Sequence, residues 1–391
     1  MHILVINAGS SSIKFSIFNA PTPESDPTAL LDGELSAIGT TEAKLRLGDT
    51  DPKAVAAKSP EEAIHLIFDA LAGPDLPAID AVGYRVVHPG PKLDRHQRIT
   101  ADVLSDLEQA TAFAPLHEPE AVALIRAAMV RFPKIPHFAC FDTIFHQTMP
   151  ESASTYPIPL AYRAKGVRRY GFHGLSCESI VRQLHAANIN PPRMIVAHLG
   201  SGCSVTTIVD GKSVDTTMGL TPTGGIVMGT RPGDLDPGLI LFLLREPGAS
   251  VDSVEHLLNH DSGIKALFGI NDMRTLRQKS DQPAAALALE IFTNSLRRAI
   301  GGMGALHGPI DAIVFTGGIG EHDAKTRWST GNALFLDQPK IDPAANDAQA
   351  RGLRKISTPD SAIAVYVVPA EEDPMIAVHV AHMMAEQPAP M

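Results

Sequence analysis

Residues 1–18 read MHILVINAGSSSIKFSIF, and this stretch decides the fold. Two apolar runs, residues 3–7 and 13–18, predict two strands, and the Gly/Ser segment between them predicts a tight turn. Glycine lets a backbone approach a ligand closely, and exposed N–H groups in such turns form concave anion sites. Two interpretations stay open for this turn, which is followed by Lys14: a phosphate-binding loop or an ordinary hairpin.

A second stretch repeats the pattern. VINAGSSSIKFSIFN at residues 5–19 resembles VAHLGSGCSVTTIVD at residues 196–210. Each places a polar residue at the end of an apolar run (Asn7 and His198), a glycine two positions later, and then a serine. A duplicated nucleotide-binding core would leave such an internal similarity. A third glycine-rich turn, at 316–321, follows another buried strand, and three such turns in one chain favour a nucleotide ligand over ordinary hairpins.

Composition limits the remaining classes of function. The chain has 391 residues, of which 44% are hydrophobic and 19% are charged, so we expect two globular domains. The net charge of -10 argues against a nucleic-acid binder. The start of the chain lacks the basic region of a signal peptide, and the run LILFLL at 239–244 is far shorter than the ~20 residues of a membrane span. Three scattered cysteines fit a reduced compartment, so we expect a cytoplasmic protein without membrane partners.

Strands alternate with helices along the chain, which predicts an α/β protein. The segment GKS at 211–213 resembles the end of a P-loop, but position 206 is Thr where that motif needs glycine, so we predict that DGK at 210–212 is a hairpin turn. The predicted strands are 78–88, 136–146 with its end at Asp142, the strand–turn–strand segment 194–214, 312–318 and 362–370, and the predicted helices are 101–114, 118–132, one that begins at Pro283, and 375–385.

Charged residues lie near the ends of the predicted strands. Phosphoryl transfer needs carboxylates that hold Mg²⁺ and cations that neutralise the phosphoryl oxygens. Salt bridges, helix caps or a buried structural histidine are the alternatives for each residue. The loop MGTRPGDLDPG, which has no periodicity, is the stronger signal. The candidates are Arg85, Asp142, His173, Arg231, Asp272, Arg274, Glu371 and Glu372.

The chain resembles the acetate kinase family over residues 3 to 380, nearly its whole length. The motifs that carry the resemblance follow the family's order and rough spacing: VINAGSSSIKF, GYRVVH, APLHEPE, FDTIFHQTMP, YGFHG, HLGSG, GKSVDTTMGLTP, MGTRPGDLDPG, NDMR, FTGGIGE and PAEEDPMIA. The resemblance implies two duplicated actin/Hsp70-like (ribonuclease H-like) domains with an interdomain active-site cleft. It implies an N-terminal domain over 1–147, joined by the C-terminal helix 374–391, and a nucleotide-binding and dimerisation domain over 148–373.

The resemblance also implies a reaction and its partners. ATP and acetate give ADP and acetyl phosphate, reversibly, with Mg²⁺ as cofactor and Mn²⁺ as a substitute. The protein is expected to be a homodimer that feeds acetyl-CoA biosynthesis. The positions that match functional residues of the family are as follows: catalytic Arg85, Asp142, His173 and Arg231; acetate-binding Arg85, Val87, Leu116 and Pro222; nucleotide-binding Lys14, Ser10, Ser12, His198, Leu199, Gly200, Ser201, Gly202, Asp272, Met273, Arg274, Gly318, Ile319, Gly320, Glu321 and His322; and magnesium-binding Asn7 and Glu372.

A mechanism follows as a hypothesis. The acetate carboxylate, already ionised at neutral pH, attacks the γ-phosphorus of ATP in line, so no general base is needed. Asp142 then organises Mg²⁺, Arg85 and Arg231 bracket the phosphoryl group, and His173 donates to an equatorial oxygen.

Three alternatives remain. The first is a propionate kinase of the same family, and the second is an Hsp70-like ATPase. The third is a pseudoenzyme, because Ser201 and His322 stand where the family usually has asparagine.

Overall fold

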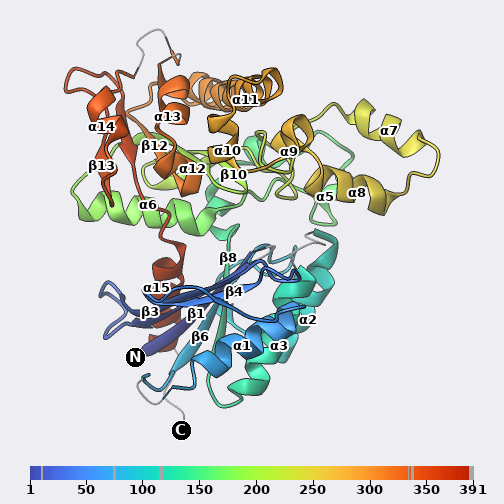
Figure 1. Cartoon of the computed structure of the whole chain (residues 1–391), viewed down its shortest axis with the longest axis vertical. Coiled ribbons are helices and arrows are strands. Elements are labelled where there is room, and N and C mark those ends of the chain that lie inside the picture. Colours follow the sequence, from blue (N-terminus) through green and yellow to red (C-terminus); the bar gives the residue numbers. More distant parts are fainter. Residues whose placement is uncertain (10–11, 74–75, 114–117, 333, 336–338, 387–391) are drawn as a thin grey trace. The chain divides into compact units, whose positions relative to one another are not determined.

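The computed structural model describes residues 1–386 apart from 10–11, 74–75, 114–117, 333 and 336–338. The chain forms two compact units (Figure 1). The first comprises Met1–Ile144 and Glu371–Met391, and the second comprises Phe145–Ala370. Each unit contains its own β-sheet, with eight strands in the first and six in the second. Among the described residues, no helix combines the length and the apolarity needed to cross a bilayer.

The first unit is a mixed sheet with helices on both faces. Its strand order is β5-β4-β3-β2-β1-β6-β8-β7, in which β1, β6 and β8 are parallel and β2 is antiparallel to β1. The elements are β1 His2–Ala8, β2 Ser12–Asn19, β3 Thr28–Ser36, β4 Lys44–Leu47, β5 Lys53–Ala54, α1 Pro60–Ala70, β6 Ala81–Val86, β7 Gln97–Arg98, α2 Ala101–Gln109, a 3₁₀ turn Ala110–Phe113, α3 Glu118–Arg131, β8 His137–Phe141 and α15 Glu372–Ala385.

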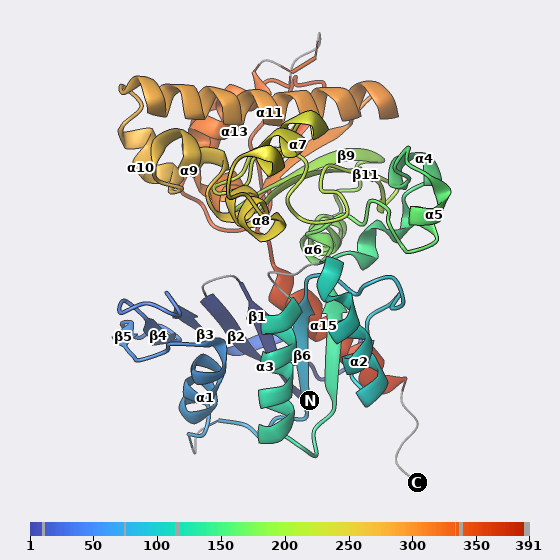
Figure 2. The same ribbon diagram turned by 90° about the vertical axis from the view of Figure 1, so that its right-hand side faces the viewer.

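Strand β1 is buried on both faces, which explains its continuous apolar run. Leu4 and Ile6 belong to the core formed with α1 and α3, whereas residues at alternate positions face α15, which packs on β1 and β6 (Figure 2). Gly83 on β6 permits this close packing, because a Cβ atom there would lie 2.7 Å from Val380 on α15. The C-terminal helix therefore completes the core of the unit that holds the N-terminus.

The second unit is built around a sheet of order β11-β10-β9-β12-β14-β13. Strands β9, β12 and β14 are parallel, and β10 is antiparallel to β9. The elements are a 3₁₀ turn Ile144–Thr148 at the boundary, α4 Glu151–Ser154, α5 Leu160–Arg163, α6 Gly174–Ala186, β9 Arg193–Leu199, β10 Cys203–Val209, β11 Lys212–Thr216, α7 Pro237–Arg245, α8 Val251–His260, α9 Gly263–Phe268, α10 Met273–Gln278, α11 Pro283–His307, β12 Ala312–Thr316, α12 Gly317–His322, α13 Ala324–Gly331, α14 Pro343–Asp347, β13 Arg354–Lys355 and β14 Ala364–Val367.

The two sheets share one arrangement of five strands. The order β3-β2-β1-β6-β8 in the first unit corresponds to β11-β10-β9-β12-β14 in the second, with the same parallel and antiparallel pairs. Asn7 and His198 occupy the same place, the next-to-last position of the first strand. The predicted internal duplication and α/β class are therefore confirmed, and each unit has the ribonuclease H-like sheet of the actin/Hsp70 fold.

Local predictions succeed where the turn chemistry is explicit. Asp210 and Gly211 have φ values of 47° and 77°, as a two-residue hairpin turn requires, so the DGK segment is the predicted hairpin. The prediction of a turn at 316–321 is wrong, because the chain enters α12 directly after β12. The strand predicted at 136–146 ends at Phe141 and continues into a 3₁₀ turn.

Candidate active site

Polar side chains gather around Asn7 near the carboxyl end of β1 in the first unit. Asn7 Nδ2 donates to Asp373 Oδ1 at 2.8 Å and to Glu372 Oε2 at 3.2 Å. Ser16 Oγ, from β2, donates to Asp373 Oδ2 at 3.3 Å. Glu372 and Asp373 open α15, so the packing of this helix on β1 brings both carboxylates to Asn7.

Arg85 on β6 connects this group to Asp142, the first residue after β8. The two strands are parallel neighbours, which places both residues at the same edge of the sheet. Arg85 Nη2 donates to Asp142 Oδ2, and Arg85 Nε lies 3.6 Å from Glu372 Oε2. Asp142 is fully buried, and its partner guanidinium is 15% exposed, so this ion pair is shielded from solvent.

The charges in this cluster shift two pKa values. Burial lowers the pKa of Arg85, but the charges of Asp142 and Glu372 outweigh it and raise that pKa above its ordinary value. Burial raises the pKa of Asp373, against the hydrogen bond from Asn7, and the charge of Glu372 raises it further. The Arg85 guanidinium therefore stays charged, and a cation that offsets the negative charge of the remaining carboxylates would stabilise the cluster.

The donor set in the first unit fits a hard divalent cation. Carboxylate and amide oxygens are the ligands that Mg²⁺ and Ca²⁺ prefer. Asn7 and Glu372, both predicted to bind magnesium, lie together, and Asp142 and Asp373 bring two further carboxylates. The Arg85 guanidinium interacts with the carboxylates of Asp142, Glu372 and Asp373, and the charge of Lys14 also acts on Asp373.

Five predicted ligand-binding residues of the first unit have less defined surroundings or fall outside the description. Lys14 pairs with Asn7 across β1 and β2, and its side chain is exposed. Val87 follows β6 and is buried. Ser12 begins β2, and its carbonyl accepts from Gly9 N–H at 2.8 Å. Ser10 and Leu116 lie outside the described residues.

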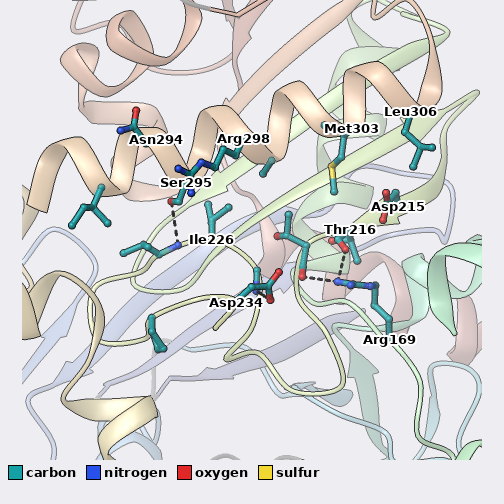
Figure 3. Close-up of a pocket in the computed structure, with 17 residues that line it drawn as sticks. Arg169, Asp215, Thr216, Ile226, Asp234, Asn294, Ser295, Arg298, Met303 and Leu306 are labelled. Atoms are coloured by element: carbon teal, nitrogen blue, oxygen red, sulfur yellow. Dashed lines mark hydrogen bonds between the residues drawn. The ribbon is translucent and has the colours of Figure 1, made fainter. Parts of the chain in front are cut away.

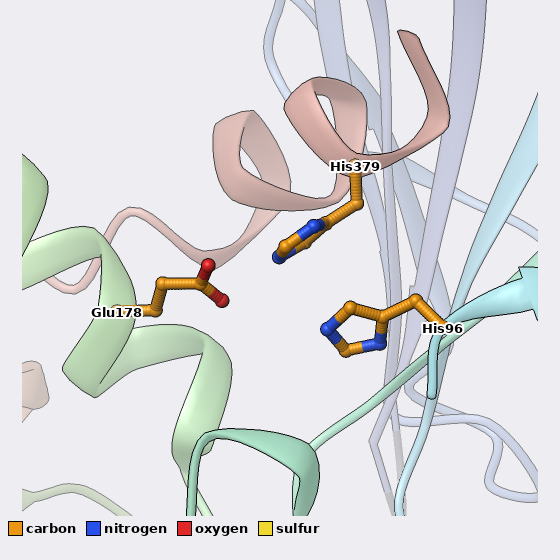
Figure 4. A group of neighbouring side chains, drawn as sticks. All are labelled: His96, Glu178 and His379. Atoms are coloured by element: carbon orange, nitrogen blue, oxygen red, sulfur yellow. The ribbon is translucent and has the colours of Figure 1, made fainter. Parts of the chain in front are cut away.

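Two histidines link the end of β8 to α15 within the first unit (Figure 4). The rings of His96 and His379 have centroids 4.1 Å apart. His96 Nδ1 accepts from the backbone N–H of Phe141 at 2.9 Å, one residue before Asp142. Glu178, also drawn in Figure 4, belongs to the second unit. Neither histidine lies within the sequence motifs that predict the site.

In the second unit, His173 and Arg231 both approach Gly202. A Cβ atom at Gly202 would lie 3.3 Å from His173 Nε2, which is tighter than most real Cβ contacts, and 3.5 Å from Arg231 Nη1. Arg231 Nη1 also donates to the carbonyl of Pro222 at 3.1 Å. The turn 200–202 is closed by a bond from Gly200 N–H to the Gly202 carbonyl at 3.0 Å. An anion beside Gly202 would meet an imidazole and a guanidinium.

His173 stacks on His198. Their ring centroids are 4.0 Å apart, and the ring planes differ by 15°. His173 Nδ1 is hydrogen-bonded to Ser204 Oγ at 2.9 Å, and His198 Nδ1 to Ser176 Oγ at 2.9 Å. All four side chains are buried, so β9, β10 and α6 hold the two rings rigidly.

A pocket of about 740 Å³ joins three segments that the sequence analysis predicted to bind nucleotide. Gly200 and Ser201 come from the turn after β9. Asp272 caps the start of α10, and Met273 and Arg274 are its first residues. Gly318, Ile319 and His322 belong to α12. The further lining residues, which the sequence analysis missed, are Asn271, Arg277, Asp323, Ala324, Lys325 and Asp347.

The backbone of α12 approaches β9 closely at the pocket. Strands β9 and β12 are parallel, with Thr316 opposite His198, so their carboxyl ends meet at one edge of the sheet. Gly317 has a φ of 76°, and a Cβ atom there would lie 2.8 Å from the Leu199 carbonyl oxygen. Only glycine fits, and α12 therefore begins beside the turn after β9. Gly320 and Glu321, the other predicted contacts of this segment, also lie in α12.

A second hollow, of about 600 Å³, lies between α11 and the segments around β11 (Figure 3). Arg169 Nη1 donates there to the carbonyls of Thr216 and Thr217 at 3.0 and 2.6 Å. Ser295 Oγ on α11 accepts from Val227 N–H at 3.3 Å. None of the site residues predicted from the sequence lines this hollow.

Comparisons with known proteins agree with one another. The sequence model described as the acetokinase family matches residues 2–378. The acetate kinase of Nitrobacter hamburgensis is 41% identical over 396 aligned residues, which cover 98% of this chain and 96% of that protein. The solved acetate kinase of Porphyromonas gingivalis superposes with a TM-score of 0.85 at 32% identity and covers 98% of this chain and 99% of that one. A propionate kinase from Francisella tularensis superposes with a TM-score of 0.88 at 36% identity, over 96% and 98%.

Proposed function

The chain belongs to the acetokinase family, and on that premise we propose that it is an acetate kinase. It is a phosphotransferase that uses ATP and ADP. The proposed reaction transfers the γ-phosphoryl group of ATP to acetate, reversibly, and gives acetyl phosphate and ADP. We propose direct in-line attack by the acetate carboxylate, which is already ionised at neutral pH by analogy with Glu.

One observation carries this proposal. The 740 Å³ pocket includes Gly200 and Ser201 in its wall, and the next residue, Gly202, is the point that His173 Nε2 and Arg231 Nη1 approach. A nucleotide in the pocket with its phosphates at this turn would present its terminal phosphoryl group to both side chains. A guanidinium and an imidazole N–H stabilise the charge that such a group carries in the transition state.

Several residues have proposed roles toward acetate. Arg85 binds the acetate carboxylate, with Val87 and Leu116 of the first unit and Pro222 of the second unit as the proposed apolar contacts of the methyl group. Asp142 does not act as a base, because an ionised carboxylate gives up no proton when it attacks. Its pairing with Arg85 supports a role in holding the charges of the site in place.

We propose Mg²⁺ as the metal of the first-unit cluster. Asn7 and Glu372 would hold it, with Asp142 and Asp373 ordering its surroundings. When bound, the ion neutralises the charge of the nucleotide phosphates. The cluster's own contribution is to fix the Asn7 amide, whose Nδ2 donates to Asp373 Oδ1 and to Glu372 Oε2.

The assembly and compartment are proposed on separate grounds. We propose a homodimer that is formed by the second unit, because α7 carries apolar side chains that its own unit leaves exposed, including Leu241 at 53% and Phe242 at 57%. We propose a cytoplasmic location, since the chain's three cysteines, all within the described part, form no disulfide.

The test is formation of ATP from ADP and an acyl phosphate, followed through a coupled reaction. Acetyl, propionyl and butyryl phosphate are compared at equal Mg²⁺ concentration. We expect the highest kcat/KM with acetyl phosphate. A preference for propionyl phosphate would favour the second candidate function, a propionate kinase, which the similarity to the Francisella tularensis enzyme supports. No ATP from any acyl phosphate would overturn the kinase proposal.

A further inference from the structure

His173 is held in a strained conformation at the start of α6. Its φ and ψ are 59° and 28°, in the left-handed region that residues other than glycine rarely adopt. A conformation of this kind costs roughly 1–3 kcal/mol and persists only where the surroundings impose it. Here His146 Nε2 is hydrogen-bonded to the Phe172 carbonyl at 2.9 Å, directly before His173. His146 therefore fixes the main chain directly before His173, and a different contact fixes the His173 ring.

The ring is fixed by Ser204. This serine is 1% exposed on β10, and its Oγ lies 2.9 Å from His173 Nδ1. A neutral imidazole carries one proton, so two arrangements are possible for this bond. Either Nδ1 donates to the hydroxyl and Nε2 is an acceptor, or the hydroxyl donates to Nδ1 and Nε2 carries the proton. The arrangement decides whether Nε2 of His173 presents a hydrogen-bond donor or an acceptor to the space beside Gly202.

We propose that Ser204 is a positioning residue whose hydroxyl donates to Nδ1 of His173 and so keeps the imidazole proton on Nε2, facing Gly202 and Arg231. The inference rests on the proposed phosphotransfer, in which His173 must donate to a phosphoryl oxygen. A phosphoryl oxygen accepts hydrogen bonds and gives none, so an unprotonated Nε2 would repel it. A hydroxyl can donate to Nδ1, whereas a carboxylate in the same place could only accept.

The neighbouring ring repeats the arrangement. His198 stacks on His173 with 4.0 Å between centroids, and its Nδ1 is bonded to Ser176 Oγ at 2.9 Å. Each ring thus has a serine hydroxyl at Nδ1, and neither of these two bonds involves a carboxylate. Two imidazolium rings at this separation would repel each other, and in a neutral pair a hydroxyl that donates to Nδ1 leaves the proton of the ring on the outward nitrogen.

The kinetic test compares Ser204→Ala with wild type. Loss of a residue that orients a ligating or donating histidine typically costs 10–100-fold in activity, so we expect kcat to fall on the order of 10-fold or more while KM for ADP stays within about twofold. Ser204→Thr, which keeps the hydroxyl, should recover most of the loss. Ser357→Ala is the matched control, because Ser357 is also buried and its hydroxyl accepts from a backbone N–H, that of Val365 at 3.0 Å, rather than bonding a histidine ring.

A double-mutant cycle separates positioning from packing. His173→Gln replaces the ring with an amide whose N–H₂ donates without Ser204. If Ser204 acts through the ring proton, Ser204→Ala should change kcat by less than about twofold in the His173→Gln background, since coupled residues are non-additive. An equal loss in both backgrounds, or a Ser204→Ala enzyme with wild-type kcat, would overturn the proposal.

A second readout does not depend on activity. Nitrogen-15 NMR of histidine-labelled wild type reports which ring nitrogen carries the proton, with the His173 signals assigned by their absence in His173→Gln. We expect the proton on Nε2. A proton on Nδ1 would overturn the inference even if the enzyme is an acetate kinase. If wild type makes no ATP from any acyl phosphate, the proposed function fails, and the NMR result still decides the tautomer.

Discussion

Asn7 Nδ2 lies 2.8 Å from Asp373 Oδ1, although the two residues are 366 positions apart in the chain. The bond joins the strand that starts the first sheet to the helix that ends the chain. Asp373 also accepts from Ser16, so the carboxylate holds two neighbouring strands. It therefore fixes the direction in which the amide of Asn7 points.

Replacement of Asp373 should raise the Mg²⁺ concentration that the enzyme requires. In Asp373→Ala, Asn7 loses one of its two carboxylate partners, and we expect the Mg²⁺ concentration for half-maximal activity to rise about 10–100-fold. A magnesium titration of initial rates measures it. Asp80→Ala is the control, because Asp80 accepts from His2 N–H at the other end of β1. An unchanged magnesium requirement would show that Asp373 does not orient Asn7.

We expect Asp142 to contribute through the negative charge of its carboxylate and not as a proton acceptor. Asp142→Asn should lower kcat on the order of 10²–10³-fold, because Arg85 loses one of its charged partners and the site loses a carboxylate. Raised Mg²⁺ should restore part of the activity. A loss that no magnesium concentration relieves would instead support proton transfer by Asp142.

Two glycines should respond in opposite directions to alanine. Gly317→Ala should destabilise the protein by about 1–3 kcal/mol and raise KM for ADP, because φ is positive and the new Cβ would collide with the Leu199 carbonyl oxygen. Gly301 lies within α11, and a Cβ atom added there would enter open space, so Gly301→Ala should stabilise by about 0.5–1 kcal/mol. Urea unfolding measures both, and destabilisation by both would contradict the argument.

Stability should fall on acidification because of His146. Burial lowers the pKa of His146 from the ordinary 6.5 to about 4. The unfolded state therefore binds a proton first, so the free energy of unfolding should decrease as pH falls from about 6.5 to 4, by about 3 kcal/mol from this residue. Urea unfolding between pH 7 and 4 measures the slope. His146→Gln, less stable at pH 7, should show a shallower slope, and an equal slope would assign the effect to other groups.

Polar substitution on α7 should change the assembly. Phe242→Glu adds a charge to an exposed apolar face, so we expect the proposed homodimer to dissociate in sedimentation-velocity experiments. Leu306→Glu, at an exposed position of α11 in the same unit, is the comparison and should leave the assembly intact. A protein that is monomeric before substitution, or dimeric after it, would remove α7 from the interface.

Much of the fold could be predicted because its signals are local. Continuous apolar runs bounded by Gly and Ser identified β1, β2, β9 and β10, and Pro283 marked the start of α11. The sequence similarity between the stretches around Asn7 and His198 indicated the duplication that the two sheets display. The segment after β12 was misjudged because a glycine-rich sequence is compatible with a turn or with a helix start, and contacts with β9 select the helix.

Residue types and order along this chain determined the strands, the hairpin turns, the repeated pattern and the family. The tertiary structure alone decided which side chains meet: Asp373 with Asn7, Ser204 with His173, and the segments that form the 740 Å³ pocket. The physical reason is the separation along the chain over which each kind of interaction acts. Turn and strand preferences depend on a few adjacent residues, whereas a hydrogen bond between distant residues exists only after strands pair and helices pack, and no local pattern marks its partners.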